Sequence, residues 1–169
     1  MTVLRILFWV VLQALIFNGI NMFGSEITPQ LHLFAVLLIP IQVDRFVWLF
    51  GCAAAGLALD ICTGTYGLHL LAGVLLGAAI PTIYRAFAPR DGYEVSDRPT
   101  VHGLGFRWVL LQTFTCSVVY CIAVESIASF QFHLLSAAVW RGLMCAVLTT
   151  VLVLLLQYLV LRSSKKSRN

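Results

Sequence analysis

Long apolar segments separated by short polar connections run through the chain from residue 4 to residue 161. A helix needs about 20 apolar residues to cross the hydrocarbon core of a bilayer, with about 17 as a lower limit. The pattern therefore predicts an all-α polytopic membrane bundle with six transmembrane helices. The predicted spans cover residues 4–20, 31–42, 46–61, 66–87, 106–128 and 133–161.

The second and sixth segments depart from the usual length of a span. Segment 31–42 is short, and Pro40 interrupts it, so we expect it to be tilted, kinked or partly interfacial. If it failed to cross, five spans would result and the basic connections would no longer share one side of the membrane. Six spans are therefore favoured. Segment 133–161 is longer than a membrane requires, so it must tilt or project.

The positions of the cations predict an orientation for these spans. Ten of the eleven Lys and Arg residues, all except Arg141, lie where every second connection would fall. Cytoplasmic loops of membrane proteins carry such an excess. We therefore expect a multi-pass protein of the inner (cytoplasmic) membrane with both termini in the cytoplasm. Residues 1–162 form a single transmembrane domain, and 163–169 form a basic tail that can contact membrane lipid.

The composition supports a membrane class over a soluble one. Hydrophobic residues make up 60% of the chain and charged residues 11%, against about 45–50% and 25% in soluble domains. The net charge of +4 comes almost entirely from loops and ends. Since the cations form no basic face interleaved with aromatic residues, no nucleic-acid partner is predicted.

Three charged residues lie within predicted spans, where each costs roughly 2.5–3.5 kcal/mol and is therefore a candidate for function. These are Asp60, Glu125 and Arg141. We expect Arg141 to pair with a carboxylate near the outer surface. Connectivity favours Glu125 as the partner, because the last two spans are joined by a short loop, whereas Asp60 is favoured by its small-residue helix, which can pack deep in the bundle. Such a pair could lock helix packing, bind a substrate or receive a partner.

Small residues predict close contacts between helices. Gly56 lies in a run of small residues, and Gly73 and Gly77 form a G-x-x-x-G pair; with Gly67 they are predicted helix-packing positions. No catalytic motif is recognisable, so we expect a protein that is not an enzyme and carries no cofactor. His32, His69 and His133 fall near the predicted outer surface, but their spacing matches no metal motif, and no metal site is predicted.

Two stretches together resemble a known family. The first is GLALDICTGTYGLHLLAG at 56–73, which includes Gly56, Asp60, Gly67 and His69. The second is FAPRDGYE at 87–94 on the predicted cytoplasmic side, which includes Arg90, Asp91, Gly92, Tyr93 and Glu94. They resemble the bacterial rod shape-determining protein family MreD, and the second stretch resembles its Bacteroidota-type members. The resemblance extends to length, segment order and basic tail.

The resemblance implies a non-catalytic scaffold subunit of the cell-elongation machinery that supports lateral peptidoglycan synthesis and cell shape. Its expected direct partner is MreC, within a wider complex of MreB, RodA and a class B penicillin-binding transpeptidase. It also implies a fold similar to the six-helix S components of energy-coupling-factor transporters. The alternative is a small-molecule (vitamin-like) binding subunit of a transporter. A polar, outward-open cavity near Asp60, His69 and Arg141 would favour that alternative.

Overall fold

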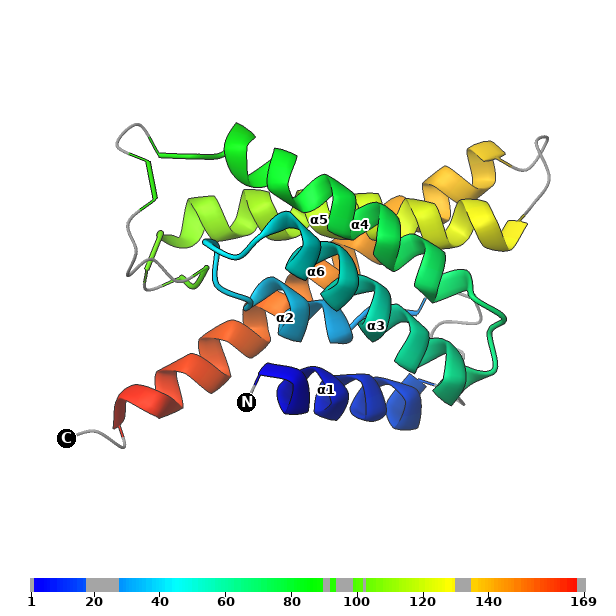
Figure 1. Cartoon of the computed structure of the whole chain (residues 1–169), viewed down its shortest axis with the longest axis horizontal. Helices are drawn as coiled ribbons and strands as arrows, with labels where there is room; N and C mark the ends of the chain where they lie inside the picture. Colours follow the sequence, from blue (N-terminus) through cyan, green and yellow to red (C-terminus); the bar gives the residue numbers. More distant parts are fainter. Residues whose placement is uncertain are drawn as a thin grey trace.

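The computed structural model describes residues 2–17, 28–89, 92–93, 99–101, 103–129 and 135–166 (Figure 1). All elements in these ranges are helices, in agreement with the predicted all-α class. In chain order they are α1 (Thr2–Phe17), α2 (His32–Leu37), α3 (Arg45–Thr63), α4 (Leu68–Ala86), α5 (Phe106–Ser129) and α6 (Leu135–Lys166).

Four of these helices are long and apolar enough to cross a membrane. They are α3, α4, α5 and the Leu135–Leu159 part of α6. The predicted multi-pass helical bundle is therefore supported in this coarser form, with boundaries close to the predicted ones. The sixth segment is long, as predicted, and its helix continues to Lys166, so the first residues of the predicted tail belong to α6.

The prediction of six spans is not confirmed for the first two segments. The apolar part of α1, Leu4–Ile16, is shorter than a span, and residues 18–20 of the predicted segment lie outside the described residues. α2 has six residues, which at 1.5 Å per residue is about 9 Å of helix. A bilayer core is about 30 Å thick. α2 is therefore too short to cross a membrane by itself. The chain that contains it nevertheless leads from the end of α1 back to the end of the bundle where α1 and α3 both begin, so the basic connections stay on one side (Figure 1).

α2 is instead enclosed by the other helices, and all six of its residues are buried. It ends at Leu37, shortly before Pro40, which explains its length. Proline cannot continue the hydrogen-bond ladder and disfavours helix at the residue before it. Non-helical backbone is tolerated at membrane depth only where protein satisfies its polar groups. The sequence pattern showed the apolar character of this segment but not that protein, rather than lipid, surrounds it.

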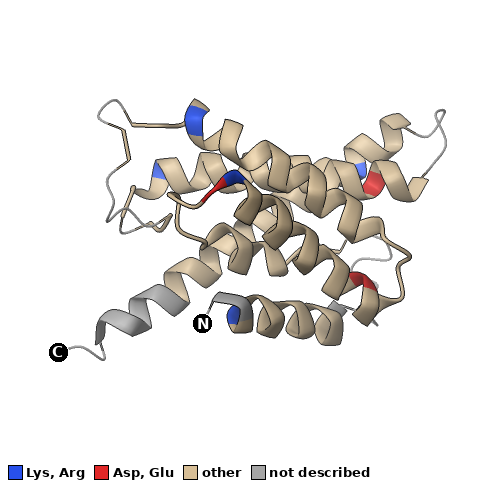
Figure 2. Cartoon of the chain, viewed as in Figure 1, with Lys and Arg blue, Asp and Glu red and all other residues tan. Residues whose placement is uncertain are grey.

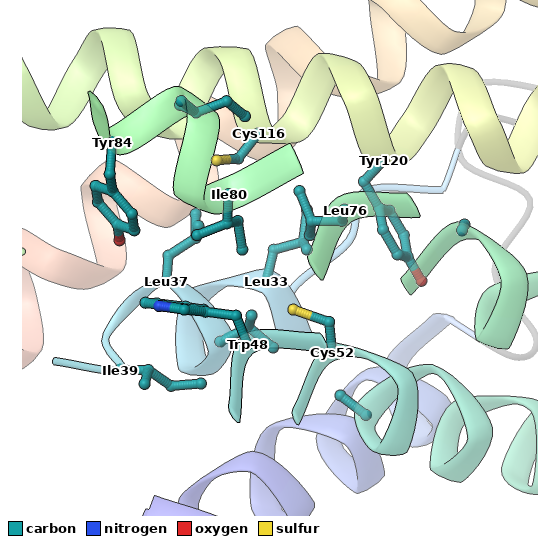
Figure 3. Packing of buried hydrophobic residues seen from close by; sticks show 14 of the residues in the cluster. Leu33, Leu37, Ile39, Trp48, Cys52, Leu76, Ile80, Tyr84, Cys116 and Tyr120 are labelled. Atoms are coloured by element: carbon teal, nitrogen blue, oxygen red, sulfur yellow. The ribbon is translucent and has the colours of Figure 1, made fainter. Parts of the chain in front are cut away.

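The main core lies around α2 (Figure 3). Leu33 and Leu37 of α2 pack among buried side chains from three longer helices. From α3 come Trp48 and Cys52, from α4 Leu76 and Ile80, and from α5 Cys116 and Tyr120.

Glycines bring α3 and α4 into backbone contact, as the small-residue pattern indicates. A Cβ on Gly73 would lie 2.5 Å from the carbonyl oxygen of Cys52, and one on Gly77 would lie 2.8 Å from the Cα of Leu49. A Cβ on Gly56 would overlap the carbonyl group of His69. Real Cβ atoms do not approach other atoms this closely. These three positions therefore require glycine.

The set of glycines at helix contacts differs from the predicted set at Gly67 and Gly142. Gly67 has a φ of +86°, and a Cβ there would meet no atom within 4 Å. Its role is to adopt a left-handed turn before α4, not to bring helices together. Gly142, which was not predicted, performs the packing role in the last hairpin, because its Cβ would lie 2.9 Å from the Cα of Ile122 on α5.

Charges divide the bundle into two ends (Figure 2). We call the basic end the one where α1, α3 and α5 begin and α4 ends. It carries Arg5, Arg45, Arg85 and Arg107. At the opposite end, α3 leads into α4 and α5 leads towards α6. Asp60, Glu125 and Arg141 lie there.

Candidate functional site: a buried polar network

Asp60 lies in the last turn of α3, and its carboxylate reaches across to the first turn of α4. One oxygen, Oδ1, accepts hydrogen bonds from the backbone N–H of His69 at 3.0 Å and from the hydroxyl of Thr65 at 2.7 Å. The other, Oδ2, accepts from the backbone N–H of Leu70 at 2.8 Å. The first amides of a helix have no partner within it, and the helix dipole favours an anion there. Asp60 therefore caps α4 from the preceding helix.

The turn between α3 and α4 places this carboxylate. Gly64 ends α3 in the left-handed conformation, with φ +71°, and its N–H bonds to the carbonyl oxygen of Asp60 at 2.8 Å. Gly67 adopts a second left-handed conformation immediately before α4. Non-glycine residues adopt such angles at a cost. The stretch Asp60-x-x-x-Gly64-Thr65-x-Gly67 thus specifies a compact helix–turn–helix corner with a buried carboxylate at its centre.

A chain of ring contacts links this corner to α2. Nδ1 of His69 lies 3.1 Å from the hydroxyl oxygen of Tyr120, and the two rings are nearly parallel. The ring of Tyr120 also meets that of His32 edge to face, with centroids 5.0 Å apart. All three side chains are buried. His69 and His32, far apart in sequence, are therefore joined through one tyrosine on α5.

Gln13 of α1 supports the backbone of α2. Its Oε1 accepts a hydrogen bond from the backbone N–H of His32 at 2.8 Å, and Nδ1 of the same histidine lies 2.8 Å away. Its Nε2 donates to Oε1 of Gln30 at 2.7 Å. Because an amide oxygen only accepts, Nδ1 of His32 carries a proton and donates to Gln13.

α6 supports the chain just before α2. The backbone N–H of Gln30 donates to the hydroxyl of Thr149 at 3.0 Å, and Sγ of Cys145 donates to the carbonyl oxygen of Thr28 at 3.2 Å. Cys145 and Cys121 lie with their sulfur atoms 3.0 Å apart. We refer below to the buried polar network, which draws on all six helices and the segment before α2. Its members are Gln13, Gln30, His32, Asp60, His69, Tyr120 and Thr149.

Arg141 forms its ion pair outside this network, between α6 and α5. Its Nε lies 3.3 Å from Oε2 of Glu125, and its Nη2 donates to the hydroxyl of Ser129 at 3.1 Å. The side chains of Arg141 and Glu125 are 35% and 15% exposed. Of the two carboxylates that the sequence left open, the structure pairs Arg141 with Glu125. The carboxylate of Asp60, the other candidate partner, is bonded to backbone amides at the start of α4.

The uncharged members of the network were missed by sequence reasoning, which weighed charged residues within spans. Gln13, Gln30, Tyr120 and Thr149 are each at most 5% exposed. A usable signal existed, because glutamines in otherwise apolar segments need hydrogen-bond partners when they are buried. Which partners they find depends on the position of α2, and that position was not apparent from the sequence.

At the basic end, the described part of the FAPRDGYE stretch closes the end of α4. The hydroxyl of Tyr93 donates to the carbonyl oxygen of Tyr84 at 2.7 Å, and the indole N–H of Trp108 donates to that of Phe87 at 2.8 Å. Gly92 takes a left-handed conformation in the turn before Tyr93. The predicted loop residues Arg90, Asp91 and Glu94 lie outside the described residues.

The network can hold helices together and fix hydrogen-bond directions. Among the described residues, no group of three or more His, Cys, Asp or Glu side chains is placed to hold a metal ion. His133 lies outside the described residues. A scan against protein-family models, a search of curated proteins and a search of solved structures each gave no match.

Proposed function

We propose that this chain is a non-catalytic membrane scaffold subunit of the bacterial cell-elongation complex, with a role like that of MreD. In this proposal it binds MreC directly and supports lateral peptidoglycan synthesis with MreB, RodA and a class B penicillin-binding transpeptidase. It lies in the cytoplasmic membrane with its basic end and both termini in the cytoplasm. The stretches at 56–73 and 87–94 support the proposal through their resemblance to MreD sequences.

The observation that carries the proposal is that charged side chains within the helices bond to neighbouring helices. Asp60 joins α3 to α4, and Arg141 joins α6 to α5. A charge in a span costs roughly 2.5–3.5 kcal/mol on insertion scales, and here that cost is offset by bonds between neighbouring helices. A bundle held in this way suits a subunit that presents a constant surface to partner helices.

The two stretches that resemble MreD also have definite structural roles. Residues 56–73 build the corner around Asp60, and Tyr93 closes the end of α4. The stretches therefore stabilise opposite ends of α4. This supports a function that depends on the shape of the bundle.

The transporter alternative predicts a polar cavity around Asp60, His69 and Arg141. In the structure, Asp60 and His69 are buried and hydrogen-bonded to protein groups. A cavity of about 480 Å³ does lie at this end, but other residues line it. They are Gly64, Thr65, Tyr66, Gly67, Leu68, Leu71, Ile127 and Ala128. We therefore favour the scaffold.

Depletion in a rod-shaped host tests the proposed role. We expect rounded cells and poor recovery of MreC, because the elongation complex loses a subunit that stabilises it. Re-expression of the parent chain should restore both. Normal elongation together with defective uptake of a vitamin would instead support the transporter alternative.

Cysteine labelling tests the proposed orientation separately. Cys62 is exposed and is replaced by serine, while the buried Cys52, Cys116, Cys121 and Cys145 are retained. A membrane-impermeant thiol reagent should then label Gly103→Cys from the cytoplasm and Tyr66→Cys from outside, since both positions are exposed at opposite ends of the bundle. Labelling of both from one side would overturn the orientation.

A further inference from the structure

A cavity of about 470 Å³ lies at the basic end, between the start of α3 and the end of α4. Its volume is in the range of small-molecule sites. Polar side chains and apolar or small residues both contribute to its lining. The polar ones are Asp44, Arg45, Thr82 and Arg85, and the others are Phe46, Leu49, Gly77, Ala78 and Pro81.

The packing of α3 on α4 explains where the cavity lies. The two backbones touch at Gly77, and the cavity occupies the space between this contact and the helix ends. Pro81 has no N–H, so it cannot donate the usual helical hydrogen bond to the carbonyl group of Gly77, four residues earlier. The cavity thus has apolar and small residues near Gly77, one carbonyl group without its helical hydrogen-bond partner, and a charged rim at the helix ends.

Three features of the rim attract an anion. Arg45 and Arg85 are both exposed, and among the described residues no hydrogen bond or ion pair engages either guanidinium group. α3 also begins here, and the side chain of its N-cap residue, Asp44, makes no capping hydrogen bond. The backbone N–H of Val47 bonds to the carbonyl oxygen of Asp44, so the amides of Arg45 and Phe46 and the positive end of the helix dipole remain open to an anion. The Asp44 carboxylate is the one opposing charge on the rim.

We propose that this cavity is a binding site for one anionic phospholipid. The phosphate lies beside Arg45, Arg85 and the start of α3, because guanidinium groups and helix N-termini both bind phosphate oxygens. One acyl chain lies against Phe46, which is 64% exposed, and Leu49. Asp44 accepts a hydrogen bond from a headgroup hydroxyl, which favours a glycerol headgroup.

The position of the cavity favours a lipid over a soluble phosphate. It opens at the ends of two helices that are long enough to span a membrane, where headgroups lie. Basic pockets between spanning helices at the cytoplasmic surface are typical sites for anionic headgroups. The site does not depend on the proposed scaffold function, since its recognition groups belong to α3 and α4 alone.

Native mass spectrometry of the full chain in detergent tests the site, with phosphatidylglycerol and phosphatidylcholine of matched acyl chains as probes. We expect one phosphatidylglycerol to bind in preference to phosphatidylcholine. Arg45→Gln/Arg85→Gln should weaken phosphatidylglycerol binding about 30-fold, on the scale of one Arg contact for each charge removed. Arg107→Gln is the matched control, because Arg107 is exposed at the same end but lies outside the cavity.

A second variant tests the cavity without changing charge. Ala78→Leu should fill the space and weaken phosphatidylglycerol binding, and it should not disturb folding because Ala78 is exposed. Free glycerol 3-phosphate should fail to compete, since it lacks acyl chains. The proposal is overturned if Arg107→Gln matches the double variant, if Ala78→Leu binds like the parent, or if glycerol 3-phosphate displaces the lipid.

Discussion

Asp60 receives hydrogen bonds from three donors, two of which are backbone amides at the start of α4. A buried amide left without an acceptor costs about 1–3 kcal/mol. The carboxylate therefore offsets the cost of its own burial by satisfying groups that would otherwise be unpaired. Its contribution is to the corner between α3 and α4, and it requires no cation.

Asp60→Ala is expected to lower the free energy of unfolding by about 2–3 kcal/mol, because it leaves the amides of His69 and Leu70 without an acceptor. Denaturant titration in mixed micelles measures this change. Asp44→Ala is the matched control, since Asp44 precedes α3 but its side chain makes no capping bond. Equal losses for the two variants would show that Asp60 does not act as a cap.

Arg141 is expected to couple energetically to Glu125 and not to Asp60. In a double-mutant cycle, Arg141→Ala and Glu125→Ala should show a coupling energy of up to about 1 kcal/mol, since the partly exposed pair is screened by water. Arg141→Ala and Asp60→Asn should be additive within about 0.5 kcal/mol. A larger coupling to Asp60 than to Glu125 would contradict the observed pairing.

At the scale of elements, α2 is the helix that depends most on contacts with the other helices. It has six residues and depends on side chains from other helices to satisfy the backbone on either side of it. Gln13 accepts a hydrogen bond from the backbone N–H of His32, and Thr149 accepts one from the backbone N–H of Gln30. Arg5 of α1 donates to the carbonyl oxygen of Leu38 at 3.2 Å. The position of α2 is thus specified by polar groups placed on α1 and α6.

Gln13→Leu is therefore expected to destabilise the bundle by about 2 kcal/mol or more, because the backbone N–H of His32 loses its acceptor and Oε1 of Gln30 loses the donor that Gln13 supplies. Gln157→Leu is the control. Gln157 is equally buried on α6, but neither of its side-chain polar atoms has a partner among the described residues. Leucine there should be neutral or stabilising. Thermal unfolding in detergent distinguishes the two variants, and a reversed order would refute the role of Gln13.

The contact between α3 and α4 provides a second test at this scale. Gly56→Ala should cost about 1–3 kcal/mol, since its Cβ meets the backbone of His69 and must force the helices apart. Gly51→Ala on the same helix should be neutral or stabilising by up to about 1 kcal/mol. Its Cβ would lie 3.8 Å from Ile39, and alanine is the better helix former. Similar stabilities would show that α3 and α4 are not in backbone contact.

These elements also show what the sequence could predict. The apolar segments of α3 to α6 are long and continuous, so length alone located them within a few residues. Segment 31–42 is equally apolar, but burial inside protein and burial in lipid favour the same residue types. The position of this segment inside the bundle depends on contacts with Gln13 and Thr149, which are distant from it in sequence. For the same reason, Asp60 was identified as unusual while its partners on α4 were not.

At the scale of the whole molecule, the polar groups are arranged by depth. Apart from Arg141, the cations whose side chains are described gather at the basic end (Figure 2), and apolar side chains fill the centre around α2 (Figure 3). Asp60 and His69 of the buried polar network lie at the opposite end, where α3 leads into α4. The network links all six helices and the segment before α2. The bundle is therefore expected to behave as one cooperative unit whose outer helix faces have a fixed arrangement. The scaffold proposal depends on this property.

Affinity purification of the tagged full chain from a rod-shaped host in mild detergent, with identification of the co-purifying proteins, tests the scaffold claim most directly. We expect MreC to be recovered with the parent chain and with Asp44→Ala, and its recovery to fall for Asp60→Ala as the bundle loses its fixed shape. Absence of MreC, together with recovery of a bound vitamin and an ATPase-coupling membrane subunit, would contradict the scaffold role.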